Sequence, residues 1–165
     1  MTNEDIIVGI VSLNDGRLVG KTRLQKTIYL LENCELGSGF EFTYYNFGPF
    51  SRDVEEATDF AVISDRIDQH KNVGNHGVQY FEFVSVEDVP EKLGNLDSET
   101  IKDYLERMGS YSSIELELAA TIAFLNNGGL DKDLVDEKIV ELKPAKATND
   151  KLKRAHDLLT ELQIA

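Results

Sequence analysis

The sequence predicts an α+β fold whose N-terminal half has the order of a winged helix-turn-helix. Three segments with helical spacing of apolar residues precede two extended segments separated by turn residues. All later periodic segments are helical. We therefore expect three helices, a short strand and a β-hairpin wing at 1–86, and a helical part at 87–165 that packs on this core as one unit.

The first two helices are predicted at about 4–13 and 21–34. Apolar residues recur at helical spacing in both: Ile6, Ile10 and Leu13 in the first, and Leu24, Ile28 and Leu31 in the second. Asn3 is the expected N-cap of the first helix. Gly16 and Gly20 let the chain turn between the two helices.

A short aromatic strand is expected at 40–46, followed by the third helix at 52–63. The Gly48-Pro49 pair is expected to break the strand as a tight turn, because proline has no N–H and restricts the residue before it. Ser51 is the expected N-cap. The inner face of the third helix consists of Val54, Ala57, Thr58 and Ala61.

A β-hairpin and four further helices complete the prediction. Extended segments at 65–70 and 78–84 flank turn residues at 72–77. Helices are expected at 97–108, 113–126, 131–142 and 149–163. No linker rich in Gly, Ser or Pro separates the two halves, so one packed unit is favoured over a flexible second domain.

Composition limits the class of protein. The formal net charge is −13, from 30 acidic and 17 basic residues spread over both halves of the chain, and such a field opposes the approach of nucleic acid. No apolar run reaches the roughly 18–20 residues of a membrane helix. With Cys34 as the single cysteine and no signal-peptide pattern at the N-terminus, we expect a cytoplasmic protein without a membrane association.

Nucleic-acid binding has one candidate cluster. Its residues form the only acid-free basic run of the N-terminal half: Arg17, Lys21, Arg23 and Lys26. The third helix would be the recognition helix, but its outer face is acidic, with Asp53, Glu55, Glu56 and Asp59 against Arg52. A groove lined by phosphates repels such a face, so nucleic acid is a disfavoured partner.

Catalytic and metal-binding signals are weak. Asp68, His70 and His76 share the predicted hairpin, yet metal sites show tighter sets of strong donors, and solvated side chains are the simpler interpretation. Cys34 has no neighbouring histidine and reads as a buried structural thiol. Gly20-Lys21-Thr22 lacks the earlier glycine of a P-loop, and no hydrolase or dinucleotide motif occurs. We therefore expect no catalytic residue, no metal and no cofactor.

A protein-binding surface is the remaining candidate. Aromatic residues gather around the Gly-Pro turn, and the predicted partner-binding residues are Tyr44, Tyr45, Phe47, Gly48, Pro49 and Phe50. Aromatic side chains are favoured at the energetic centres of interfaces. The alternative is that several of these rings fill the core.

Two motifs within this stretch resemble those of a known family. Leu24-Gln25-Lys26-Thr27-Ile28-Tyr29 followed by Phe47-Gly48-Pro49-Phe50-Ser51 resembles the YwgA-like small proteins of bacteria and archaea, which are related to the Panacea antitoxin domain. Leu118-Ala119-Ala120-Thr121 and Glu141-Leu142-Lys143-Pro144 are also similar to YwgA-like members. The resemblance implies a winged-helix-like core without enzymatic activity and, for the Panacea branch, an antitoxin or protease adaptor.

The leading hypothesis is therefore a non-enzymatic module that binds a partner protein, such as a toxin or defence protein, through the aromatic turn and the 51–63 helix. The alternative is a winged-helix DNA-binding transcriptional regulator that uses Arg17, Arg23 and Lys26 and acts as a dimer. A homodimer is compatible with both hypotheses.

Overall fold

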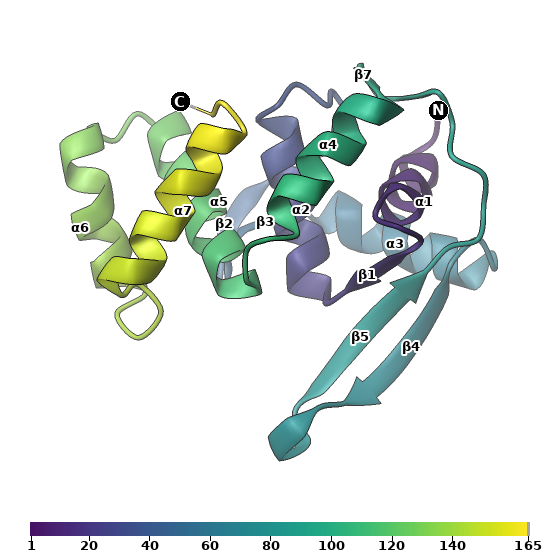
Figure 1. Ribbon diagram of the computed structural model, residues 1–165, viewed down its shortest axis with the longest axis horizontal. Helices are drawn as coiled ribbons and strands as arrows, with labels where there is room; N and C mark the ends of the chain where they lie inside the picture. The colour runs from purple at the N-terminus through teal and green to yellow at the C-terminus, as the bar shows by residue number, and fades with distance from the viewer. Residues whose placement is uncertain (165) are drawn as a thin grey trace.

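A computed structural model describes residues 1–164, which fold into seven α-helices and small antiparallel sheets (Figure 1). The helices are α1 (Asn3–Leu13), α2 (Lys21–Glu32), α3 (Arg52–Ile63), α4 (Ser98–Met108), α5 (Ser113–Asn127), α6 (Lys132–Leu142) and α7 (Asn149–Glu161). The strands are β1 (Arg17–Val19), β2 (Thr43–Tyr45), β3 (Gly48–Phe50), β4 (Asp68–Val73), β5 (Gln79–Val84), β6 (Lys92–Leu93) and β7 (Leu96–Asp97). The α+β class is as predicted, and the observed helix bounds lie close to the expected ones.

The largest sheet has three antiparallel strands in the order β1-β5-β4. Leu18 of β1 lies opposite Phe83 of β5, and both side chains are buried. The β4–β5 hairpin was predicted, and Figure 1 shows it extending away from the helical body. Strand β1 was not predicted, because three residues between two glycines show no period and become a strand only by pairing with β5.

The segment around Gly48-Pro49 differs from its prediction. Gly48–Phe50 is itself a strand, β3, which pairs with β2 in the register Tyr44↔Pro49, and the turn is the preceding Asn46-Phe47. Proline is tolerated in β3 because a two-stranded sheet leaves it at an edge, where its missing N–H removes no ladder bond. The aromatic strand is also shorter than expected and spans Thr43–Tyr45.

Side-chain caps fix the ends of α1 and α3. The N-cap of α1 is Thr2 and not Asn3, because Thr2 and Asp5 form a reciprocal capping box. Ser51 caps α3 as predicted, with its hydroxyl accepting from the Val54 N–H. The predicted inner face of α3 is confirmed, since its buried residues are Val54, Ala57, Thr58 and Ala61.

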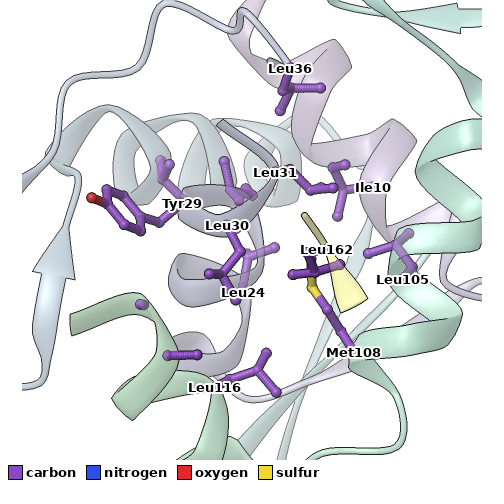
Figure 2. Close-up of a cluster of buried hydrophobic side chains, with 14 of the residues drawn as sticks. Ile10, Leu24, Tyr29, Leu30, Leu31, Leu36, Leu105, Met108, Leu116 and Leu162 are labelled. Carbon is purple, nitrogen blue, oxygen red and sulfur yellow. The ribbon is translucent and has the colours of Figure 1, made fainter. Parts of the chain in front are cut away.

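Residues from both halves of the chain share one hydrophobic core. Figure 2 shows Leu24 and Leu30 of α2 among Leu105 and Met108 of α4, Leu116 of α5, and Leu162. The helix α5 packs against α2, α7 and β3. The boundary predicted at residues 86 and 87 stays a prediction, and within residues 1–164 the packing crosses it.

Gly48 joins this core to the β2–β3 hairpin. Its φ is +96°, and a Cβ at this position would lie 2.6 Å from the Thr121 hydroxyl oxygen of α5. Glycine is therefore required both by the backbone conformation and by the close approach of β3 to α5.

We expect Gly48→Ala to destabilise the fold by about 2–4 kcal/mol, because backbone strain and a steric clash act together. Urea unfolding followed by circular dichroism measures this loss. Gly39→Ala is the matched control, since Gly39 also has a positive φ, +83°, but has nothing within 4 Å of its Cβ position. Equal losses for the two variants would contradict the proposed close packing of β3 on α5.

Candidate functional site

Two side chains of α2 fasten strand β3 to the body. The Gln25 side-chain amide donates to the Ser51 carbonyl and its oxygen accepts from the Ser51 N–H, each at 2.9 Å. The Lys26 ammonium donates to the Pro49 carbonyl at 2.8 Å. These bonds satisfy buried backbone groups along the outer edge of β3, and we call the set the α2–β3 clamp. They hold the hairpin in one position.

Buried charges lie behind the clamp. Lys26 is 2% exposed and Glu117 of α5 is 3% exposed. The Glu117 carboxylate pairs with Lys143 at 2.8 Å and with Lys146 at 3.1 Å. Burial lowers the pKa of Lys26 to about 8; the charge of Glu117 opposes this shift, and those of Lys143 and Lys146 add to it. The negative charge of Glu117 therefore acts on three amines, those of Lys26, Lys143 and Lys146.

The predicted partner-binding residues divide into exposed rings and buried backbone. Tyr45 is 59% exposed, Phe47 52% and Tyr44 38%. Gly48 and Pro49 are buried, and Phe50 is half-buried. We call Tyr44, Tyr45 and Phe47 the exposed aromatic surface. The alternative prediction, that these rings fill the core, does not fit their exposure.

Contacts beneath the exposed rings hold them in place. The Tyr45 ring lies 5.5 Å from that of Phe50, and the Tyr44 ring lies 5.8 Å from that of Phe124 on α5. The Lys146 ammonium lies 4.9 Å from the centre of the Phe47 ring. Rings that are fixed in this way lose little conformational entropy on binding a partner.

A groove of about 650 Å³ lies beside this surface, between the hairpin, α2 and α3. Tyr45, Phe47 and Phe50 line it together with Phe83 of β5. Its carboxylates are Glu41, Asp53, Glu55 and Asp59, and its basic groups are Lys21, Lys26 and Arg52. The groove thus combines aromatic surface with acidic side chains, mostly from α3.

The four predicted nucleic-acid-binding residues do not form one basic surface. Arg17 pairs with Glu82 at 2.5 Å, and the Lys21 ammonium lies 4.2 Å from the centre of the Phe81 ring. Arg23 donates to the carbonyls of Met108 at 2.9 Å and Tyr111 at 3.1 Å, and Lys26 is buried in the clamp. Each residue already has a partner within the protein.

The other candidates remain apart. Asp68 and His70 lie on β4 and His76 beyond it, and the structure brings no three His, Cys, Asp or Glu side chains of residues 1–164 into a metal-binding group. Burial raises the pKa of Cys34 to about 11, which disfavours the thiolate that a nucleophile requires. No helix in residues 1–164 has the length and apolar character to cross a membrane.

The sequence prediction missed the buried charges of the second half. No charged role was predicted for Glu117, Lys143 or Lys146, although Glu117 is the lone acid in the mostly apolar stretch from Leu116 to Ala123. A single carboxylate on a buried helical face is a signal that it has a cationic partner. Which lysines would supply that charge depended on the packing of the loop after α6.

Together these features define an α+β protein whose hairpin carries aromatic rings and is fastened to a helical body by buried polar bonds. No protein-family model matches the chain. The chain is similar to YwgA of Bacillus subtilis (strain 168), a relative described as an uncharacterized protein. The two are 24% identical over 155 residues, which cover 91% of this chain and 90% of the relative. This similarity therefore extends over nearly the whole length of both chains.

The lowered pKa of Lys26 predicts a pH dependence of stability. The unfolded lysine binds its proton up to a pH near 10.5, whereas the folded one releases it near pH 8. The unfolded state then holds more protons between these values, so this residue makes the free energy of unfolding rise with pH from about 8 to 10.5.

Lys26→Met should abolish this rise while weakening the clamp by about 1–3 kcal/mol, because the Pro49 carbonyl loses its donor. Urea unfolding at several pH values from 7 to 10 compares the two proteins, and other titrating groups cancel in the difference. Parallel pH profiles would contradict a buried, desolvated amine at this position.

Proposed function

We propose that this protein is a non-enzymatic protein-interaction module whose binding surface is the exposed aromatic surface together with the neighbouring face of α3. The observation that carries the proposal is the exposure of Tyr45 and Phe47 on a hairpin that the α2–β3 clamp holds rigid. Large aromatic side chains that solvent reaches, but whose position is fixed, are typical of interface hot spots.

The order of elements supports a winged-helix-like core for this module. Helices α1, α2 and α3, strand β1 and the β4–β5 hairpin follow one another as in a winged helix, with β1 at one side of β5 and β4 at the other. The outer face of α3 is acidic where a DNA-reading helix needs donors. A partner protein with a basic or apolar surface fits this face better than a nucleic acid.

An antitoxin or adaptor role is the biological form that we propose for this binding. It is motivated by the resemblance of the Gln25-Lys26 and Gly48-Pro49 motifs to those of Panacea-related proteins. The partner would be a toxin or defence protein that is neutralised or regulated by contact, in the cytoplasm. Nucleic-acid binding stays an alternative, for which Arg17, Lys21, Arg23 and Lys26 offer no common free surface.

Tyr45→Ala and Phe47→Ala should each weaken partner binding by about tenfold or more without changing the unfolding midpoint markedly, because both rings are largely exposed. The tagged protein is isolated from its own host, and co-purifying proteins are identified and quantified by mass spectrometry. Affinities for the captured partner are then compared by titration calorimetry.

Tyr80→Ala is the matched control, since Tyr80 is an exposed aromatic residue of β5 that does not line the groove. It should leave binding unchanged. Unfolding of the Tyr45 and Phe47 variants would assign these rings to the core and overturn the proposal. Nuclease-sensitive nucleic acid in place of a protein would instead support the regulator.

A further inference from the structure

Strand β2 has an open edge. The β2–β3 sheet contains two strands in the part of the chain that the structure describes, and the outer edge of β3 is covered by Gln25 and Lys26 of the clamp. All three residues of β2, Thr43 to Tyr45, are exposed. An exposed strand edge presents unpaired N–H and C=O groups and is a template for another strand.

The peptide groups of Tyr44 point toward this edge. Tyr44 lies opposite Pro49, which has no N–H, so the two form a non-hydrogen-bonded pair of the antiparallel ladder. In such a pair the N–H and C=O of both residues point away from the partner strand. The Pro49 carbonyl fits this geometry, because it points outward to the Lys26 ammonium. The corresponding groups of Tyr44 face the open side.

The same strand presents side chains to the groove. Thr43 and Tyr45 are two residues apart, so their side chains share one face, and both line the groove. A strand added beside β2 would place alternate side chains on this face, next to Tyr45. Main-chain bonds and side-chain contacts could then form with one extended segment.

The charge of the groove selects a cationic segment. Its carboxylates Glu55 and Asp59 are exposed on α3, and Asp53 accepts the Glu41 N–H at 2.9 Å. Two of the three basic groups have partners elsewhere: Lys21 lies over Phe81, and Lys26 binds Pro49. Arg52 is the remaining cation. Carboxylates beside aromatic rings match the guanidinium group, which forms paired hydrogen bonds and stacks on rings.

We propose that an extended, arginine-containing segment of a partner protein adds to β2 as a third strand and places its guanidinium groups in this groove. The proposal rests on the proposed function, to which it adds the mode of binding and the chemistry of the partner. The net charge of −13 favours the approach of such a segment over the whole surface.

The test uses a short, terminally blocked peptide of alternating arginine and valine, labelled with fluorescein, and fluorescence anisotropy with the full chain. We expect saturable binding. The same peptide with alternate amides N-methylated should bind about tenfold more weakly, because it cannot pair with β2, although its charge is unchanged. A glutamate–valine peptide should not bind.

Two pairs of variants locate the site. Tyr44→Pro should weaken binding about tenfold more than Tyr44→Ala does, because both variants lose the ring but only the proline variant also loses the outward N–H. Asp59→Lys should weaken binding more than Glu56→Lys, since Glu56 is equally exposed on α3 but does not line the groove. Equal effects within either pair would overturn the proposal.

The outcomes separate this proposal from the proposed function. A captured partner that depends on Tyr45 but tolerates Tyr44→Pro, and that the arginine peptide does not displace, overturns strand addition and leaves the interaction module intact. A captured partner whose binding does not depend on Tyr45 overturns both strand addition and the interaction module. Sedimentation without peptide tests for a dimer. Concentration-dependent dimerisation that Tyr44→Pro abolishes would assign the β2 edge to a second copy of the chain, and would overturn the proposal of an arginine-containing partner segment.

Discussion

The α2–β3 clamp is the interaction on which the rest of this structure depends. Gln25 and Lys26 bond the backbone of Ser51 and Pro49, and all four residues lie in a region from which water is excluded. Buried backbone groups that lose such partners cost free energy comparable to a lost hydrogen bond each. The clamp therefore fixes β3, and with β3 it fixes the start of α3 and the exposed rings of the hairpin.

The second half of the chain supports this clamp from behind. Glycine at position 48 lets β3 approach Thr121 of α5, one helical turn from Glu117, whose carboxylate pairs with the buried Lys143 and the half-buried Lys146. The sequence motifs around Lys26, Gly48, Thr121 and Lys143 thus meet at one place. Packing and charge at this place explain why these motifs occur.

The residues of the aromatic segment differ in their roles because of this arrangement. Gly48 and Pro49 are buried and structural, whereas Tyr45 and Phe47 are exposed and available. The motif that identifies the hairpin is therefore distinct from the surface that we propose to bind. Substitutions at the motif are expected to act on stability, and those at the rings on binding.

The sequence by itself determined the α+β class, the seven helices and the β4–β5 hairpin, because long periodic segments carry their own signal. It also placed the inner face of α3 and the aromatic residues around Gly48-Pro49. Only the tertiary structure decided that β1 and β3 are strands, since such short segments gain strand geometry only from a partner. It likewise decided that Lys26 is buried, because its burial requires the Pro49 carbonyl and Glu117, which are distant in sequence and are brought to it by folding.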